Sequence, residues 1–160
     1  MGLLSGTAQA QAGLELTCTT EQRTTYSPGV TLFPSHQDIR LDSTFAGCVS
    51  PTRPSVTSGS ASFSLAGSRS CLALDRTIAG TSRITWNTGE TSVYSYSSTT
   101  ATLAGQIVVT IVGSVTSGPF QGGAITILVA SPAVNLLSCL FPPGITSRTG
   151  VGTVVIASLR

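Results

Sequence analysis

The chain has 160 residues, of which 9% are charged, and its formal net charge is +2. This length is typical of one domain with a core large enough to fold alone, and the low charge excludes the basic stripe of a nucleic-acid-binding protein. With 24 threonines, 23 serines and 17 glycines, the composition favours strands and turns over helices. We therefore expect an all-β fold.

Residues 1–12 differ from the rest because they contain two overlapping A-x-A patterns, Ala8–Ala10 and Ala10–Ala12. Such small-residue patterns are typical of signal-peptidase sites, although the preceding basic and apolar regions are missing here. We interpret residues 1–12 as the remnant of a secretory signal peptide and expect a mature start at Gly13 or Gln11. The alternative is a flexible N-terminal arm. The sequence has no apolar run of about 18 residues, so no membrane-spanning helix is expected.

The first half of the chain contains short segments that alternate between apolar and polar residues, which is typical of half-buried strands. A strong turn is expected at Ser27–Gly29, and a proline-flanked loop follows at Val49–Pro54. Within the most regular segment, Ile39, Leu41 and Phe45 are predicted to point inward. The predicted strand segments are Leu14–Cys18, Gln22–Tyr26, Val30–Phe33, Gln37–Phe45 and Ser60–Leu65.

The stretch from Arg83 to Gly118 contains the only tryptophan, Trp86, and the longest β-branched run, Ile107–Val112. The turn residues Asn87–Gly89 lie between two strand-like segments and predict a hairpin. A second turn is predicted at Ala104–Gly105. Because Ile107–Val112 is apolar at every position but one, we expect a central strand that is covered on both faces.

The C-terminal part adds the strand segments Ala124–Ala130 and Val151–Ile156, separated by a short apolar segment at Asn135–Leu140. In total the chain predicts about nine to eleven short strands with regularly spaced turns, which is the pattern of a β-sandwich. Trp86 follows Cys71 closely, so the sandwich is Ig-like only in a loose sense. We expect residues 13–160 to form a single β-sandwich domain, without a linker.

The sequence contains few groups that could perform catalysis. Its one histidine, His36, would need Asp38 or Asp42 for a triad, and no G-x-S-x-G motif presents a serine. Asp75 and Glu90 are the remaining carboxylate pair of interest, and solvated turn residues are the simpler interpretation. We predict no catalytic, cofactor-binding or metal-binding residues, and hence a protein that is not an enzyme.

Two groups of side chains favour a binding function. Arg69, Arg76 and Arg83 are close in sequence and could bind an anionic polymer, although isolated surface arginines are the simpler interpretation. Tyr94 and Tyr96 lie on one face of a predicted strand, near Trp86. Such aromatic rows either stack on sugars or pack in a core. A secreted carbohydrate- or cell-wall-binding module is therefore an alternative function.

The four cysteines, Cys18, Cys48, Cys71 and Cys139, are expected to form two disulfides. Their even number, without C-x-x-C spacing or a histidine cluster, argues against a zinc site. Three pairings are possible. Disulfides of this kind indicate an oxidising, extracellular location.

A set of short motifs occurs in a fixed order along the chain. The motifs are Leu16–Cys18, Tyr26–Gly29, Ser70–Leu72, Thr85–Gly89, Val115–Gly118, Asn135–Leu140 and Pro143–Thr146. This pattern covers nearly all of Gly13–Ile156 and resembles a family of small secreted β-sandwich proteins from Streptomyces and other actinobacteria, similar to the adaptor subunit of umbrella toxin particles.

The resemblance implies a secreted, non-enzymatic adaptor without a cofactor. Its protein partners would be a large repeat-containing polymorphic toxin and a lectin subunit that carries a degenerate trypsin-like protease domain, and its role would be bacterial competition. Together with the strand order, the resemblance favours the pairings Cys18–Cys48 and Cys71–Cys139. A secreted enzyme inhibitor on a disulfide scaffold is a third, weaker interpretation.

The first and last predicted strands carry almost no charge, and exposed strand edges usually carry protective charges or prolines. We therefore predict that a partner binds at the mature N-terminus, either by adding a strand to the sheet or by accepting the terminus in a cleft. The alternative is that both termini pair within the sheet. Removal of the terminal segment should weaken partner binding and spare the fold. The predicted partner-binding residues are Gly13, Leu14, Glu15, Leu16 and Thr17.

Overall fold

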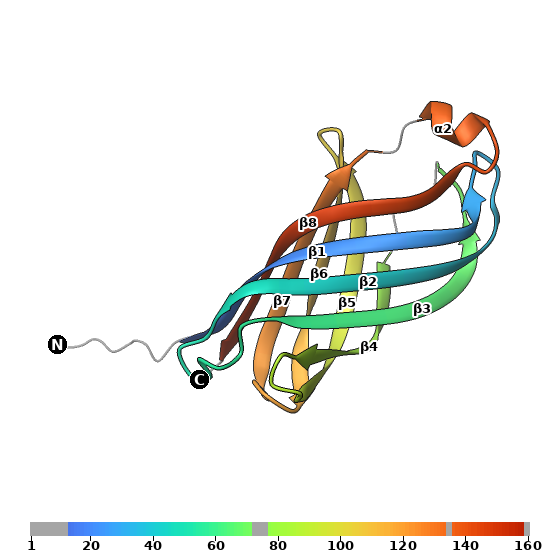
Figure 1. Cartoon of the computed structure of the whole chain (residues 1–160). Coiled ribbons are helices and arrows are strands. Elements are labelled where there is room, and N and C mark those ends of the chain that lie inside the picture. Colours follow the sequence, from blue (N-terminus) through green and yellow to red (C-terminus); the bar gives the residue numbers. More distant parts are fainter. Residues whose placement is uncertain (1–12, 72–76, 134–135, 159–160) are drawn as a thin grey trace.

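The computed structural model describes residues 13–71, 77–133 and 136–158. These residues form one antiparallel sheet of eight strands, which closes into a barrel in the order β1 to β8 (Figure 1). A short helix, α2, precedes the last strand and lies at one end of the barrel. The elements are β1 (Gly13–Val30), β2 (Ser35–Val49), β3 (Gly59–Arg69), β4 (Thr77–Trp86), β5 (Thr91–Leu103), β6 (Gln106–Ser117), β7 (Gly123–Pro132), α2 (Leu136–Leu140) and β8 (Ile145–Ser158).

The all-β prediction is confirmed, but the predicted sandwich is wrong because the sheet closes on itself. Strand β1 pairs with β2 on one side and with β8 on the other, so the first and last strands of the barrel are neighbours. Alternating inward and outward residues occur in sandwiches and in barrels alike, so this pattern does not distinguish them. The strands are also fewer and longer than expected, which a tilted closed barrel accommodates.

The predicted turn at Ser27–Gly29 lies inside β1 instead of ending it. The register of β1 against β8 shifts between Thr25 and Val30, which indicates that the chain bulges here and stays in the sheet. Gly29 has φ +141°, and a Cβ atom at this position would lie 2.0 Å from the Pro143 carbonyl oxygen. Gly29 therefore allows the bulged part of β1 to lie close to Pro143, in the segment that precedes β8.

The two hairpins of the central stretch are confirmed. The Trp86 amide donates to the Glu90 carbonyl at 2.8 Å, and Gly89 adopts φ +91° in the turn between β4 and β5. Ala104 and Gly105, both with positive φ, form the turn between β5 and β6. In β6, Val112 is 49% exposed, so the prediction that this strand is covered on both faces is wrong.

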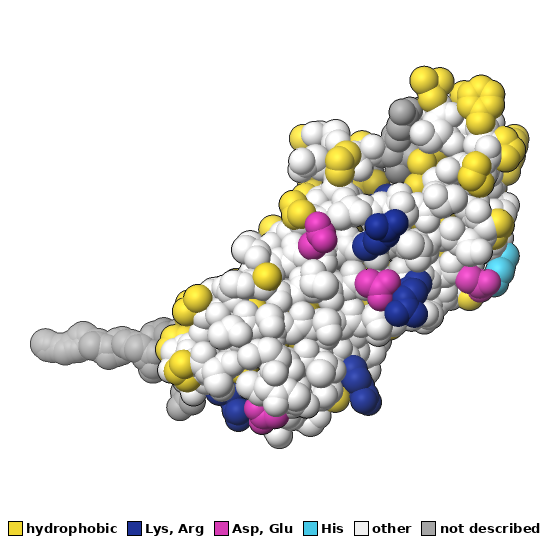
Figure 2. All heavy atoms as spheres, in the orientation of Figure 1, with side chains coloured by type: hydrophobic (Ala, Val, Ile, Leu, Met, Phe, Trp, Pro, Cys, Tyr) yellow, Lys and Arg dark blue, Asp and Glu magenta, His cyan; other side chains and the backbone are white. Residues whose placement is uncertain are grey.

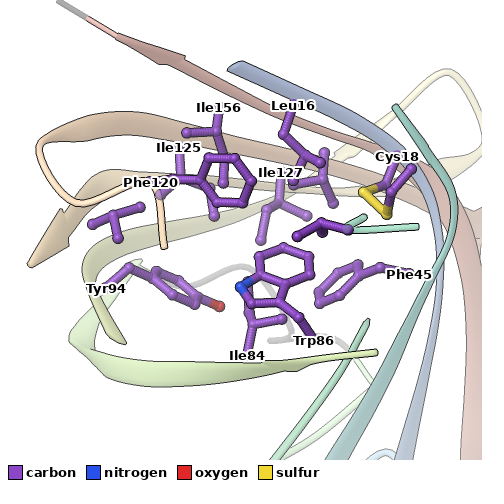
Figure 3. Packing of buried hydrophobic residues seen from close by; sticks show 14 of the residues in the cluster. Leu16, Cys18, Phe45, Ile84, Trp86, Tyr94, Phe120, Ile125, Ile127 and Ile156 are labelled. Atoms are coloured by element: carbon purple, nitrogen blue, oxygen red, sulfur yellow. A yellow bond between two sulfur atoms is a disulfide. The ribbon is translucent and has the colours of Figure 1, made fainter. Parts of the chain in front are cut away.

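The larger hydrophobic cluster lies around Trp86, which is 2% exposed (Figure 3). Its ring packs against Phe45 and Phe120, with centroid distances of 6.3 and 5.7 Å. The indole Nε1–H donates to the Ser92 hydroxyl at 2.8 Å, and this hydroxyl donates to the Pro119 carbonyl at 2.6 Å. The buried polar atom of the indole is thus satisfied, as a closely packed core requires.

Both predicted disulfides are present. Cys18–Cys48 links β1 to β2, and Cys71–Cys139 links the chain after β3 to α2, across sequence separations of 30 and 68 residues. In the chain-entropy description, loops of this size stabilise the fold by about 3.7 and about 4.4 kcal/mol. A smaller hydrophobic cluster around Tyr26, Val30 and Ile39 surrounds the second disulfide. Each cluster therefore contains one disulfide.

We expect Trp86→Ala to lower the free energy of unfolding by about 3–5 kcal/mol, because it removes a fully buried ring from the larger cluster. Urea denaturation followed by circular dichroism measures this loss. Thr85→Ala, an outward-facing control in the same strand, should change stability by less than about 0.5 kcal/mol. Equal effects of the two substitutions would contradict the assignment of Trp86 to the core.

Candidate functional site

The predicted partner-binding residues Gly13–Thr17 form the start of β1 and pair with the end of β8. The register shifts between Leu14 and Leu16, so these two side chains point to opposite sides of the sheet. Leu16 is fully buried in the larger cluster, whereas Leu14 is 52% exposed. Among the five predicted residues, Leu14 is thus the one large apolar side chain that a partner can reach.

The argument from exposed strand edges is wrong for this protein, because a closed barrel leaves neither β1 nor β8 at an edge. The structure also gives a reason to expect that deletion of residues 13–17 would destabilise the fold. This deletion would remove Leu16 from the core and break the β1–β8 pairing at the barrel's closure. Leu14 is therefore the apolar side chain of this segment that is exposed for contact.

The aromatic residues that suggested a sugar-binding row do not form one on the surface. Trp86 and Tyr94 are 2% and 4% exposed and belong to the larger cluster. Tyr96 is half-buried, points into the barrel, and has its ring centroid 5.7 Å from that of Tyr94. Tyr94 and Tyr96, but not Trp86, line one wall of an interior cavity instead.

The polar groups considered for catalysis lie apart and exposed. His36 Nε2 is 3.6 Å from an Asp38 oxygen, with both side chains at least 71% exposed. Asp42 pairs with Arg40 at 3.1 Å, and Glu90 pairs with Arg53 at 3.7 Å. Asp75, the other carboxylate of the considered pair, lies outside the described residues.

The three arginines that suggested an anionic-polymer site do not form one surface. Arg69 is 7% exposed and points into the barrel, whereas Arg83 lies on the outer face of β4. Arg76 lies outside the described residues. Residues 13–71, 77–133 and 136–158 contain no cluster of three or more His, Cys, Asp or Glu side chains that could hold a metal ion. Over the same ranges, no helix has the length and apolar character needed to cross a membrane.

One end of the barrel exposes a group of large apolar side chains, which we call the apolar end: Phe33, Leu137, Leu140 and Phe141. Phe33 follows β1, and the other three belong to α2 and the residue after it. The two segments approach each other closely. Gly144 lies so near Val30 that an added Cβ atom would be only 2.2 Å from the Val30 carbonyl oxygen. Figure 2 shows hydrophobic side chains gathered over this end. Exposed clusters of this kind are typical of protein-binding surfaces.

An interior cavity of about 90 Å³ lies between the two hydrophobic clusters. It touches Tyr94 and Ile111 of the larger cluster and Tyr26 and Ile39 of the smaller one. Seven of the eight strands contribute to its lining, and β7 does not. The middle of the barrel is therefore lined by side chains from almost its whole circumference.

The cavity has a polar side that includes a guanidinium group. Arg148 of β8 donates from Nε to the Tyr26 hydroxyl at 3.0 Å and from Nη1 to the Ser131 hydroxyl at 3.1 Å. Arg69, at the end of β3, brings a second guanidinium to the lining. No Asp or Glu among the described residues lines the cavity. The charged side chains among its described lining residues, Arg69 and Arg148, are both cationic and would attract an anion.

Burial raises the pKa of the Tyr94 phenol above its ordinary value of about 10, with a hydrogen bond to Ser82 opposing the shift and Tyr96 adding to it. Burial also raises the pKa of the Tyr96 phenol. Both phenols therefore stay neutral at physiological pH and can donate hydrogen bonds. Burial is the largest cause of both shifts.

Comparison of the chain with protein-family models, curated proteins and solved structures finds no match. The resemblance to the secreted adaptor family remains a prediction from the sequence motifs. Sequence reasoning missed the apolar end and the cavity residue Arg148. For the cavity, the available signal was the inward row Gln22, Thr24 and Tyr26 of β1, which is polar where a core strand is normally apolar.

The raised pKa of Tyr94 predicts alkaline destabilisation. The folded state holds this proton more tightly than the unfolded state, so the stabilisation is complete below pH about 10 and is lost as pH rises through the folded-state pKa. Urea denaturation at increasing pH should show this fall, and Tyr94→Phe should flatten it. An identical pH dependence in the variant would contradict the assignment.

Proposed function

We propose that this protein is a secreted, non-enzymatic adaptor that binds two protein partners at the two ends of its barrel. The observation that carries the proposal is the apolar end, whose side chains are 53–78% exposed on a barrel with few charges. Apolar side chains at this exposure are costly in water and favourable in a protein interface. The two disulfides are typical of an oxidising, extracellular environment.

An adaptor needs two separate binding surfaces. The apolar end lies at the end of the barrel where α2 is found, whereas the described chain begins at Gly13, at the opposite end (Figure 1). There, Leu14 offers an exposed apolar side chain on a strand that is paired on both sides. The disulfides and the closed sheet hold the two surfaces at a fixed separation, which suits a bridging subunit.

The family resemblance suggests the identity of the partners. They would be a large repeat-containing polymorphic toxin and a lectin subunit with a degenerate protease domain, joined by this adaptor in an antibacterial umbrella toxin particle. The carbohydrate-binding alternative was based on an exposed aromatic row. Trp86 and Tyr94 are buried, so these two residues do not form such a row. Because β1 is paired with both β2 and β8, the contact at the N-terminal surface would be made by side chains and loops, not by strand addition.

We expect the double variant Phe33→Asp and Phe141→Asp to abolish binding of one partner, because it places two charges in the centre of an apolar interface. The measurement is recovery of the repeat-containing toxin or the lectin subunit on the tagged protein from culture supernatant of the producing bacterium. Val112→Asp, an exposed apolar position on the barrel side, is the control. Unchanged recovery of both partners by the double variant would refute the role of the apolar end.

Substitution of two leucines of β1 should have different effects, because Leu14 is exposed and Leu16 is buried. Leu14→Asp should remove the other partner and leave the melting temperature almost unchanged, because Leu14 is exposed. Leu16→Ala should instead lower the free energy of unfolding by about 2–5 kcal/mol, because it leaves a cavity in the core. Thermal melts and partner titrations of the two variants test this separation. Full partner binding by a folded Leu14→Asp variant would exclude the terminal surface.

A further inference from the structure

We propose that the interior cavity binds an amphipathic monocarboxylate of the fatty-acid class. Its carboxylate would lie at Arg148, and its acyl chain would run along Phe63, Leu65 and Ile78 toward the gap between β3 and β4. This function is independent of the adaptor role, because none of the lining residues belongs to the apolar end or to Gly13–Thr17. Eight-stranded barrels have an interior of the size that holds one small ligand.

Arg148 supplies the anion-binding group. Its guanidinium is half-buried and donates to the hydroxyls of Tyr26 and Ser131, which are both neutral. Among the described residues, the ion pairs join His36, Arg40 and Arg53 to carboxylates, and Arg148 takes part in none of these pairs. A guanidinium has five N–H donors, so two hydrogen bonds leave donors for a carboxylate. A carboxylate would thus add charge-assisted hydrogen bonds to a positive group that takes part in none of the ion pairs of the described residues.

The wall facing this polar side includes apolar side chains beside the part of the sheet where β3 and β4 are not paired. Strands β3 and β4 pair only through Gly59 with Trp86 and Ser60 with Thr85. Beyond these pairs, residues 61–69 of β3 and 77–84 of β4 have no mutual pairing, and Figure 1 shows the two strands diverging. Phe63 and Leu65 on one strand and Ile78 on the other line the cavity beside this gap, and all three are half-buried although they point inward.

The size of the cavity decides how such a ligand lies. A cavity of about 150 Å³ holds a molecule such as benzene, so about 90 Å³ accommodates a carboxylate with its first methylene groups. The rest of an acyl chain must pass through the gap between β3 and β4, where it covers the half-buried side chains of Phe63, Leu65 and Ile78. A slender chain satisfies this geometry, and a branched or polycyclic body does not.

The same lining argues against a polar anion such as a sugar phosphate. A hydroxyl group that contacts only Phe63, Leu65 and Ile78 would lose its hydrogen bond to water without gaining one from these side chains, which costs about 1–3 kcal/mol. An acyl chain gains about 0.8 kcal/mol for each methylene group that it buries. The chemistry of the two walls therefore selects a molecule with one anionic end and one apolar chain.

Fluorescence titration with cis-parinaric acid, a fluorescent fatty acid, tests the proposal on the intact disulfide-bonded protein. We expect saturable binding of one molecule per barrel, with displacement by dodecanoate. Dodecanol lacks the charge and propionate lacks the chain, so both should displace the probe at least about tenfold more weakly than dodecanoate does. Absence of saturable binding, or equal displacement by dodecanol and dodecanoate, would overturn the proposal.

Two variants locate the ligand in the barrel. Arg148→Gln should weaken dodecanoate binding by about 10- to 100-fold and leave dodecanol binding unchanged, because it removes only the charge-assisted bonds. Arg83→Gln, which removes the same charge from the outer face of β4, is the matched control and should bind dodecanoate normally.

Leu65→Trp keeps Arg148 in place and fills the apolar wall, so it should weaken binding of dodecanoate and of dodecanol alike. Circular dichroism confirms that each variant is folded before it is titrated. Dodecanoate binding that survives in folded Arg148→Gln and Leu65→Trp variants would place the ligand elsewhere and overturn the proposal.

Discussion

The pairing of β1 with β8 is the constraint on which the rest of the structure depends. It joins the first strand to the last from Gly13 with Ser158 to Val30 with Ile145, and it turns a meander of hairpins into a closed barrel. This pairing satisfies the backbone hydrogen-bonding groups that β1 and β8 would expose as edge strands of an open sheet. It also fixes which surfaces remain for binding, since neither terminal strand can accept a further strand.

Closure creates a second requirement, which is that the interior must be filled from both ends. The larger cluster with Trp86 fills one part, and the smaller cluster near the Cys71–Cys139 disulfide fills the other. Glycines permit the close approach of neighbouring strands, as at Gly113, where a Cβ atom would lie 1.9 Å from the Ser95 carbonyl oxygen. The cavity lies where the two clusters meet, beside the gap between β3 and β4.

Local signals in the sequence predicted most of the elements but not their closure. The alternation around Ile39 and the turn residues at Gly89 and Gly105 depend on neighbours in the chain, and the structure confirms them. The disulfide pairing followed from the family resemblance together with strand order. Barrel closure and the cavity depend on contacts between distant strands, as between Arg148 and Tyr26. A single sequence contains no direct signal for such contacts.

The polar side of the cavity is costly for a protein that needs only a rigid barrel. Gln22 is 7% exposed, and Arg148 contributes a half-buried charge, in places where apolar side chains would bury favourably. Replacing buried charges by well-packed apolar groups often stabilises proteins, so these residues weaken the interior that the barrel encloses. Departures from consistent core packing concentrate at functional sites. The polar interior therefore marks a binding site, whereas the two ends of the barrel present the surfaces suited to protein partners.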